Sequence, residues 1–505
     1  MTFARIHELV EQHLSLRPDA PAIKDCDGTL YSWRQYHGLI AEAEALLRSH
    51  GAAPNERVLV VAENCLAVPV LMMACSRIGA WAVPVNARMS TAEIARITAH
   101  AKPVLTFYTS NVSKEAAAHA GDAAGIAPGI TTGFGALHIA AGSSDPEPLP
   151  ETSSPPALLL YTTGTTGDPK GVMLSHANLV FAAIASSELR GLGPQDHVYG
   201  ALPLTHVFGV ASMLMASAYT GAMVELVTRF VPADLFHALR SGTTVMPAVP
   251  QMHALLMAHA EAQGLKKLGS ETLRYVSSGA APLDPAWKRK AEAFYGLPLQ
   301  NGYGMTETTA GVCGTRNRIG DPDISVGSPL RGVELKLDLD VGEDAEVGEI
   351  LTRGPQVMLG YFRNPAATAA MMTDDGFLRT GDLGKWDDQG RLHVVGRSKE
   401  LIIRSGFNVY PPEVEAALND HPAVVQSAVV GRRVNGDEEV VAFVQPSQDG
   451  AVTEDDLRAY VSTRLAGYKR PSRILVVEAL PVAATGKILK HRLLTHFSGL
   501  LKTEE

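Results

Sequence analysis

The sequence predicts a large α/β domain with layered subdomains, then a small β-barrel-like subdomain, then a small α+β domain at the carboxyl end. Three observations lead to this class. A chain of 505 residues is too long for one hydrophobic core. Strand-like apolar runs alternate with helical stretches through the first two-thirds, which is typical of layered, largely parallel sheets. From about residue 330 short strands with tight turns replace that alternation.

The amino-terminal elements follow from local patterns. The opening stretch "MTFARIHELVEQHL" predicts an amphipathic helix, because its charges come too early and too often for a secretory signal. The most apolar segment, 65–86, is interrupted by Pro69 and Arg77, so it predicts a buried helix followed by a strand and not a membrane span. Residues 140–157 are rich in Pro and Ser and predict a surface connector. We expect strands at 57–65, 80–86, 104–110, 157–163, 197–204 and 222–228, and helices at 92–101 and 232–242.

The second part of the chain carries weaker signals. Short strands are expected at 333–340, 348–354 and 390–396. A domain boundary close to Ser398 would divide the chain into residues 1–397 and 398–505. In the tail we expect strands at 423–431, 439–445 and 473–480, and a helix at 453–465.

Composition narrows the functional class. A formal net charge of −9 argues against a general nucleic-acid binder. Four cysteines that form no C-x-x-C pair suit a reducing compartment. No G-x-G-x-x-G opens a helix after a strand, which disfavours a hydride-transferring dehydrogenase. We therefore expect a cytoplasmic enzyme without a nucleic-acid partner or a transmembrane segment.

The stretch "LLLYTTGTTGDPKGVMLSH", residues 158–176, is expected to run from a strand through a loop into a helix. The loop consists of threonines and glycines with one lysine, Lys170, so backbone N–H groups and hydroxyls could surround phosphate. It is not the common nucleotide loop G-x-x-x-x-G-K-[ST], because Pro169 precedes Lys170 and Gly171 follows it.

Six further stretches accompany this loop: "PLTHVFG" (203–209), "SSGAAPL" (277–283), "NGYGMTETT" (301–309), "TGDLG" (380–384), "GRSKELIIRSGFNVYPPEVE" (396–415) and "ATGKILKHRL" (484–493). With them the chain resembles the adenylate-forming superfamily of acyl-CoA synthetases, peptide-synthetase adenylation domains and luciferases. The resemblance spans nearly the whole chain in the family's motif order, and is greatest to a stand-alone bacterial acyl- or aryl-CoA synthetase. It implies that a carboxylate attacks the α-phosphate of ATP, that pyrophosphate leaves, and that the acyl group passes to CoA, with Mg²⁺ as the metal.

The resemblance assigns the nucleotide site residue by residue. The pyrophosphate would be held by Thr162, Thr163, Gly164, Thr165, Thr166 and Lys170, where relatives usually have serine in place of Thr163. The nucleoside and α-phosphate would be held by Gly279, Ala280, Ala281, Asn301, Tyr303, Gly304, Thr306, Asp382, Arg397 and Lys487. Tyr303 offers a face for the adenine, and Asp382, expected at a strand end, could accept both ribose hydroxyls. Glu307 is the expected Mg²⁺ ligand, since this cation prefers carboxylate oxygen.

The carboxyl-terminal domain is expected to move. By resemblance, Lys487 reaches the reacting carboxylate and α-phosphate during adenylation and is withdrawn afterwards, with Lys399 at the hinge. Gly406 would line the channel for the CoA thiol. Tyr468, Lys469 and Arg470 match positions that contact the CoA nucleotide in aryl-CoA ligases. The neighbours Lys490, His491 and Arg492 are interpreted as surface charge.

The residues expected around the acid are His206, Val207, Phe208, Pro247, Ala248, Gly279, Gly302, Gly304, Thr309 and Ala310. All are apolar, small or neutral apart from His206, and a second buried carboxylate would need a cationic partner. Malonate-specific relatives carry an arginine where this chain has Leu255. We therefore expect a monocarboxylic acid with an aromatic, alicyclic or medium-to-long aliphatic body. His206 is expected at the pocket edge, with a gate or a core histidine as the alternatives, and is grouped with Lys487, Thr306, Glu307 and Arg397 as catalytic.

The acceptor remains open at this point. The stretch "VVGRRVNGDEEVVAF" (429–443) is about two residues shorter than the family's usual pattern and lacks its proline. A ligase that passes the acyl group to an amine is therefore the alternative to a CoA ligase. A binding protein without turnover is disfavoured, because Thr306, Glu307 and Lys487 are all present. A homodimer is left open.

Overall fold

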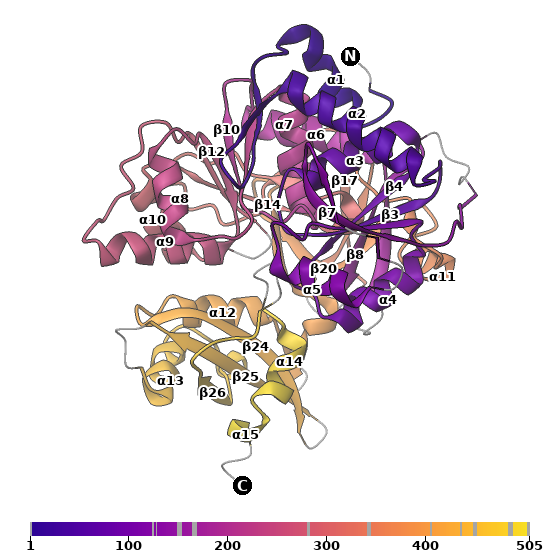
Figure 1. Cartoon of the computed structure of the whole chain (residues 1–505). Helices are drawn as coiled ribbons and strands as arrows, with labels where there is room; N and C mark the ends of the chain where they lie inside the picture. Colours follow the sequence, from indigo (N-terminus) through magenta and orange to yellow (C-terminus); the bar gives the residue numbers. More distant parts are fainter. Residues whose placement is uncertain are drawn as a thin grey trace.

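The computed structural model describes residues 3–123, 126–127, 129–148, 154–163, 169–279, 283–340, 345–404, 407–434, 437–447, 452–482 and 488–501. Figure 1 shows a large amino-terminal body and a smaller body that contains the carboxyl-terminal helices labelled α12, α13, α14 and α15. No helix in the described ranges is long and apolar enough to cross a membrane.

The first large sheet has eight strands in the order β19-β9-β8-β4-β3-β5-β7-β6. Its bounds are β3 Arg57–Ala62, β4 Trp81–Asn86, β5 Leu105–Tyr108, β6 Ile130–Thr132, β7 Gly135–Ala141, β8 Pro156–Thr163, β9 Pro169–Ser175 and β19 Gly360–Tyr361. The inner strands β5, β3, β4 and β8 are parallel, and the flanking pairs are antiparallel. The apolar runs predicted at 57–65, 80–86, 104–110 and 157–163 are confirmed as β3, β4, β5 and β8.

The second large sheet has nine strands in the order β16-β15-β14-β13-β12-β10-β11-β1-β2. Its bounds are β1 Pro21–Lys24, β2 Leu30–Ser32, β10 His197–Gly200, β11 Met223–Leu226, β12 Val245–Ala248, β13 Tyr275–Ser278, β14 Leu299–Tyr303, β15 Cys313–Gly314 and β16 Ser328–Pro329. Strands β1, β11, β10, β12, β13 and β14 are parallel. The carboxyl ends of β12, β13 and β14 therefore lie at one edge of this sheet.

Helices cover both sheets. Their bounds are α1 Glu8–Leu16, α2 Trp33–Ser49, α3 Ala67–Ile78, α4 Thr91–Ala101, α5 Lys114–Asp122, α6 His176–Arg190, α7 Ala216–Thr220, α8 Pro232–Arg240, α9 Pro250–Ala262, α10 Pro285–Tyr295 and α11 Pro365–Ala370. Helix α3 is the buried helix that the apolar segment 65–86 predicts, and β4 is the strand that follows it. Serines in capping boxes fix the starts of α2, α4 and α6.

One hydrophobic core joins the two sheets. It contains Val58 of β3, Leu158 of β8, Val198 of β10 and Val276 of β13. The alternate residues of the first sheet, such as Leu59 and Val83, enter a second core on its opposite face. Because both faces of these parallel strands are covered, their sequences are almost continuously apolar.

The β-rich subdomain expected after residue 330 is a four-stranded antiparallel sheet in the order β17-β18-β20-β21. Its strands are β17 Glu334–Asp338, β18 Gly348–Arg353, β20 Leu378–Trp386 and β21 Leu392–Arg397. Asp382 lies inside β20 and not at a strand end as we expected. The strand continues through Gly381, whose φ of 72° accommodates an irregular step.

The carboxyl-terminal residues form separate sheets and separate cores. The strands are β22 Ile402–Arg404 and β23 Phe407–Val409 in one sheet, and β24 Val424–Val434, β25 Asp437–Pro446 and β26 Arg473–Val476 in another. The helices are α12 Pro411–Asn419, α13 Glu454–Ser462, α14 Lys490–His496 and α15 Ser498–Leu501. Two apolar cores here draw on residues from Ile402 onward.

Candidate active site

The sheet edge formed by β12, β13 and β14 brings several expected site residues together. Ala248 ends β12, Gly279 follows β13, and the backbone N–H of Gly279 donates to the carbonyl of Ala248 at 3.0 Å. Asn301 of β14 pairs in register with Ser278. In α/β sheets, ligands bind outside the carboxyl ends of the strands. This edge is therefore the candidate site for the acid and the nucleotide.

Phe208 contacts this edge from the connection that follows β10. A side chain at Gly279 would place its Cβ 3.0 Å from Cε1 of Phe208, so the ring packs directly against the glycine. Phe208 begins a π-helix, Phe208–Met215, and such wide turns occur frequently at functional sites. Next to it, Val207 is buried, and Nδ1 of half-buried His206 accepts from the backbone N–H of Phe208 at 3.2 Å. In the neutral ring this assigns the proton of His206 to Nε2.

The Thr-Glu pair lies on a buried 3₁₀ turn, Thr306–Thr308, which follows β14. Thr306 and Glu307 are both buried. The next residues, Thr309 and Ala310, have φ values of 48° and 77°. Positive φ is a genuine outlier for a β-branched residue and concentrates at functional sites. The strained backbone adds a local signal to the Thr-Glu motif.

Lys170 lies near Glu307, although 137 positions separate them in the sequence (307 minus 170). Lys170 is on strand β9, opposite Thr162 of β8, so both side chains are on the same face of the sheet. The Nζ of Lys170 lies 4.8 Å from the ring centroid of Tyr361. The hydroxyl of Tyr361 donates to Oε1 of Glu307 at 2.8 Å. The structure thus connects the phosphate-loop lysine to the expected metal carboxylate through one tyrosine.

The strand position of Lys170 corrects our sequence interpretation, which placed it in a loop running into a helix. Residues 169–175 form β9, and the helix begins only at His176. The reason is antiparallel pairing with β8, from Pro156↔Ser175 to Thr163↔Pro169. Lys170 therefore has a fixed backbone, although its side chain keeps the reach of a lysine.

A segment that sequence reasoning missed, residues 355–362, bridges these parts. The backbone N–H of Met358 donates to the carbonyl of Glu307 at 2.9 Å, and that of Phe362 donates to Gly171 at 2.7 Å. Tyr361 pairs with Val172 through the two-residue strand β19. We call residues 355–362 the bridging segment. It attaches the Thr-Glu turn to the strand that carries Lys170.

Asp382 and Arg397 are brought together with Tyr303. The Tyr303 hydroxyl donates to Oδ2 of Asp382 at 2.6 Å, and Nε of Arg397 donates to Oδ1 at 3.0 Å. Asp382 and Arg397 are direct partners across β20 and β21. Burial, followed by the Asp382 carboxylate, raises the pKa of Tyr303 well above its ordinary value, so this phenol remains a donor. The carboxylate has further lone pairs with which to accept hydroxyl groups.

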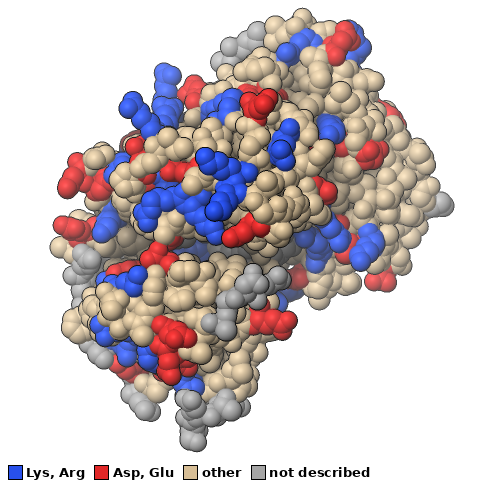
Figure 2. Space-filling model, turned by 90° about the vertical axis from the view of Figure 1, so that its left-hand side faces the viewer, with Lys and Arg blue, Asp and Glu red and all other residues tan. Residues whose placement is uncertain are grey.

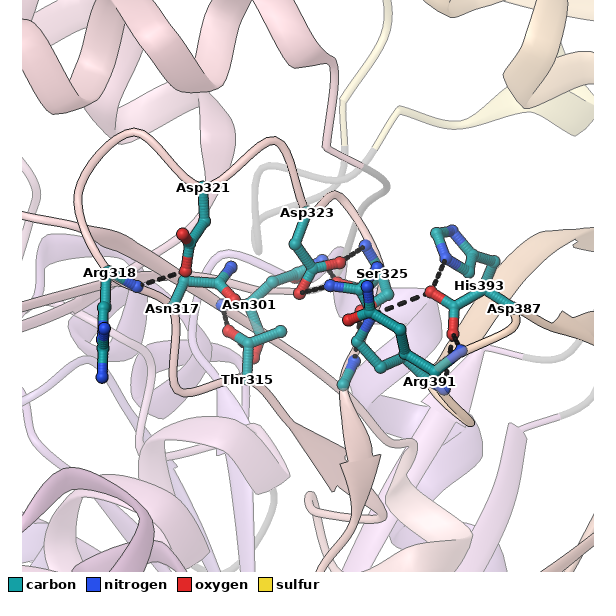
Figure 3. Close-up of polar contacts among 12 residues, drawn as sticks. Asn301, Thr315, Asn317, Arg318, Asp321, Asp323, Ser325, Asp387, Arg391 and His393 are labelled. Atoms are coloured by element: carbon teal, nitrogen blue, oxygen red, sulfur yellow. Dashed lines mark hydrogen bonds and ion pairs between the residues drawn. The ribbon is translucent and has the colours of Figure 1, made fainter.

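A polar network holds Asn301 in position (Figure 3). Its backbone N–H donates to Oγ1 of Thr315 at 2.8 Å, and its Nδ2 donates to the carbonyl of Ser325 at 3.0 Å. Ser325 in turn donates its N–H to Asp323, whose other oxygen lies 3.4 Å from Nη1 of Arg391. Buried networks of this kind rigidify when fully satisfied. The network ties β14 to the four-stranded sheet that carries Asp382.

The residues present fit a magnesium ion held mainly by phosphate. In the described ranges, no group of three or more His, Cys, Asp or Glu side chains could hold a metal. One carboxylate, Glu307, follows Thr306 in the chain and is connected to Lys170 through Tyr361. Mg²⁺ typically uses one or two carboxylates plus substrate phosphates and waters, so this donor set suits it. The ion would supply neutralisation of phosphate charge at this point.

The candidate acceptor residues gather around the hairpin β22–β23. Phe407 and Tyr468 stack with ring centroids 4.8 Å apart. Nη1 of Arg404 donates to the backbone carbonyls of Tyr468 and Arg470, at 3.2 and 2.7 Å. Lys469 donates to both carboxylate oxygens of Glu413, at 2.6 and 2.8 Å. Tyr468, Lys469 and Arg470 therefore lie next to this hairpin.

The hinge candidate Lys399 is exposed on a short 3₁₀ turn, Ser398–Glu400, between β21 and β22. The interpretation of Lys490 as surface charge is wrong. Its Nζ lies 2.7 Å from Oε1 of Glu415 and 3.4 Å from Oε2 of Glu400, and 22% of its side chain is exposed. Helix α14 turns Lys490 toward α12 and the hinge, which the basic sequence around it did not indicate.

Some expected residues lie outside the described part of the chain: Gly164, Thr165, Thr166, Ala280, Ala281, Gly406 and Lys487. Thr163 ends β8 opposite Pro169. Pro247 lies on β12, Gly302 on β14, and Gly304 directly after β14. An added Cβ at Gly304 would lie 1.5 Å from the carbonyl oxygen of Ala310, so the backbone approaches itself closely here. Tyr361 was missed, because no local pattern distinguishes it from an ordinary buried tyrosine.

Comparison with known proteins identifies the family of the chain. The model of the family described as AMP-binding enzyme matches residues 10–362, and that of its C-terminal domain matches residues 413–487. A 4-coumarate–CoA ligase from Oryza sativa subsp. japonica is 33% identical, over 96% of this chain and 93% of the relative. A feruloyl-CoA synthase from an Amycolatopsis species is 32% identical, over 94% and 95%.

Solved structures extend the likeness to the whole fold. The ATP-bound structure of MatB from Rhodopseudomonas palustris is 27% identical, covers 99% of this chain and 100% of that chain, and has a TM-score of 0.84. The predicted class, a large α/β domain with a smaller carboxyl-terminal domain, is confirmed. The amide-forming alternative is not needed, because the curated relatives are CoA ligases. The chain belongs to the AMP-binding enzyme family and is an AMP-forming acid–thiol ligase.

Proposed function

We propose that this ligase activates an apolar monocarboxylic acid with ATP and transfers the acyl group to CoA. One observation carries the assignment of the site: Lys170, Tyr361 and Glu307 come from three distant segments and are in contact. A cation for the leaving phosphates and a carboxylate for the metal are thereby held together, as an adenylation site requires.

Each residue has a proposed role in the first half-reaction. Thr162 and Lys170 bind the β- and γ-phosphates, Thr306 contacts the α-phosphate, and the Asp382–Arg397 pair orients the ribose. The carboxylate oxygen attacks the α-phosphorus, the bond from that phosphorus to the bridging oxygen breaks, and pyrophosphate leaves. Lys487 neutralises the charge that builds up between the two anions. Holding both reactants in place removes most of the entropic barrier.

The second half-reaction gives the thioester. The CoA thiolate attacks the acyl carbon and AMP leaves. We propose that residues 398–505 rotate about Lys399 between the steps, so that Gly406 replaces Lys487 beside the reacting groups. The separate cores from Ile402 onward support this division. On the face drawn in Figure 2, Lys and Arg side chains gather above the hollow between the two bodies, which favours approach of the polyanions ATP and CoA.

The proposed substrate has an aromatic, alicyclic or medium-to-long aliphatic body. The pocket candidates are apolar, small or neutral apart from His206, and Phe208 offers a ring at the pocket wall. Three relatives are named as a 4-coumarate–CoA ligase, a feruloyl-CoA synthase and an indoleacetate–CoA ligase, which favours an aromatic acid. Another relative is named as a sulfoacetate–CoA ligase. A sulfonate would need a cationic partner in the pocket, and these ten residues include no lysine or arginine. Four free cysteines support a cytoplasmic location.

Product analysis tests this proposal. The protein would be mixed with ATP, Mg²⁺, CoA and a panel of 4-coumarate, phenylacetate, cyclohexanecarboxylate, octanoate, malonate and sulfoacetate. Mass spectrometry of the products should detect an acyl-CoA for at least one apolar acid and for neither dianion. A thioester formed only from malonate or sulfoacetate would overturn the substrate class.

A further inference from the structure

Tyr361 occupies a place that nothing in the family motifs assigns. It is 5% exposed and contacts both Lys170 and Glu307, the two groups that the proposed adenylation site brings together. Its hydroxyl reaches Glu307 at 2.8 Å, and its ring lies 4.8 Å from the ammonium nitrogen of Lys170. The Tyr361 side chain therefore contacts Glu307 through its hydroxyl and Lys170 through the face of its ring.

We propose that Tyr361 is a positioning residue for adenylation: it fixes the Glu307 carboxylate with its hydroxyl and holds Lys170 against its ring. The inference rests on the proposed roles of Lys170 and Glu307. A cation is attracted to the face of an aromatic ring, and a phenol donates strongly to a carboxylate. Both contacts are made within the chain, so one side chain fixes the phosphate cation relative to the metal carboxylate.

The backbone of the bridging segment prevents Tyr361 from moving away. Its residues pair with β9 at Gly360↔Met173 and Tyr361↔Val172. The N–H of Tyr361 donates to Oγ1 of Thr368 at 2.9 Å. Gly360 has a φ of 139°, and an added Cβ there would lie 2.8 Å from Cγ2 of Thr368. The backbone that carries the Tyr361 ring is thus held by strand pairing with β9 and by a hydrogen bond to Thr368 of α11.

The chemistry of the pair leaves the carboxylate usable. Tyr361 engages one oxygen of Glu307, and a carboxylate retains a second oxygen and further lone pairs for a cation. The Tyr361 hydroxyl can therefore orient the Glu307 carboxylate and still leave one of its oxygens to bind the metal ion.

Two substitutions separate the two contacts. Tyr361→Phe keeps the ring beside Lys170 and removes the hydrogen bond to Glu307. Tyr361→Leu removes both contacts. Tyr295→Phe is the matched control, because Tyr295 is also buried, its hydroxyl lies 2.8 Å from Nδ1 of His253, and neither residue is among those expected at the site. All variants are compared by thermal melting, by calorimetric binding of ATP with and without Mg²⁺, and by acid-dependent pyrophosphate exchange.

For Tyr361→Phe we expect the half-saturating Mg²⁺ concentration to rise about tenfold, the cost of one hydrogen bond to a charged group. Saturating Mg²⁺ should restore the exchange rate, and binding of metal-free ATP should be unchanged. Tyr361→Leu should also weaken metal-free ATP, because Lys170 loses its ring. In a Glu307→Ala background, Tyr361→Phe should have no additional effect on the Mg²⁺ dependence of ATP binding, measured by calorimetry.

The opposite results are equally clear. A Mg²⁺ dependence of Tyr361→Phe that matches Tyr295→Phe would overturn the inference, as would a lower melting temperature with no change in Mg²⁺ dependence. Additive effects of Tyr361→Phe and Glu307→Ala would also overturn it. If the wild-type protein exchanged pyrophosphate with no acid, the proposed function would fail instead, and calorimetry would still decide the role of Tyr361.

Discussion

Replacing Asp382 with alanine removes the acceptor that joins Tyr303 to Arg397. Asp382 is 5% exposed, and its two oxygens accept at 2.6 Å from the Tyr303 hydroxyl and at 3.0 Å from Nε of Arg397. Under our proposal the same carboxylate accepts both ribose hydroxyls of ATP. The substitution should therefore affect both folding stability and nucleotide binding.

The two contacts contribute unequally to stability. Loss of a buried hydrogen bond to a charged group costs about 1.5–3 kcal/mol, and this applies to the Tyr303 contact. The Arg397 side chain is 45% exposed, so solvent screening limits its contribution to less than about 1 kcal/mol. We expect the free energy of unfolding to fall by about 2–3 kcal/mol. The two ribose contacts should raise the dissociation constant of ATP about 100-fold, at roughly a factor of ten each.

Asp196 provides the matched control. It is 2% exposed, and it accepts from Arg274 and Thr244 as Asp382 accepts from Arg397 and Tyr303. It directly precedes β10 and so lies at the amino-terminal edge of the parallel strands, opposite the candidate site. Asp196→Ala should lower the denaturation midpoint at least as much as Asp382→Ala, with the ATP affinity unchanged in calorimetry.

Two results would refute this reasoning. If Asp382→Ala left ATP affinity within twofold of wild type, Asp382 would have no part in nucleotide binding. If Asp196→Ala weakened ATP as strongly as Asp382→Ala, the loss would reflect general destabilisation and not a contact with the ribose.

Three further substitutions address other parts of the protein. Lys487→Ala should abolish acid adenylation, measured by pyrophosphate exchange, but spare thioester formation from preformed acyl-adenylate; equal loss of both steps would contradict its role. Gly304→Ala should lower the free energy of unfolding in urea by about 3 kcal/mol or more, because the added Cβ would lie 1.5 Å from the carbonyl oxygen of Ala310. Gly121→Ala is its control: the added Cβ meets no atom within 4 Å, so the free energy of unfolding should not change. Burial lowers the pKa of His253 from 6.5 to about 4. As pH falls from 6.5 to 4, His253 therefore becomes protonated in the unfolded chain while it stays neutral in the folded chain. Stability should drop there by up to about 3 kcal/mol, and unfolding of His253→Gln between pH 7 and 4 should show a shallower slope; an unchanged slope would show that other groups cause the loss.

The parts of the fold that the sequence predicted are those with strong local signals. Strands such as β3 and β4 are apolar on both faces because both faces are buried, and this leaves a continuous run in the sequence. The helix α3 follows the same logic. The π-helix at Phe208–Met215 has no such signature, since an apolar run does not reveal the hydrogen-bond spacing.

The sequence predicts the site residues that stand in single motifs, and it misses those whose place depends on contacts between distant segments. Thr306, Glu307 and Asp382 stand in motifs that resemble a known family. Strand β9 does not follow from the sequence, because Pro169 and Gly171 obscure a pairing that only β8 reveals. Tyr361 was missed for the same reason: its contacts with Lys170 and Glu307 depend on pairing across sequence separations of 191 and 54 residues (361 minus 170, and 361 minus 307).

Lys490 illustrates how charge patterns mislead. It precedes His491 and Arg492 in a basic stretch, which is usually a solvated face. Helix α14 instead directs it toward Glu415 and Glu400, where two carboxylates compensate its partial burial. The sequence contains both acids, but their distance from Lys490 along the chain gives no indication of the contact.

Acid-dependent exchange of labelled pyrophosphate into ATP tests the central claim most directly. The protein, Mg²⁺ and ATP would be incubated with each acid of the panel in the absence of CoA, so that only the first half-reaction is measured. We expect exchange with at least one apolar monocarboxylic acid, little exchange without acid, and loss of exchange in Glu307→Ala. Exchange that does not depend on any acid, or that survives Glu307→Ala unchanged, would contradict adenylation at this site.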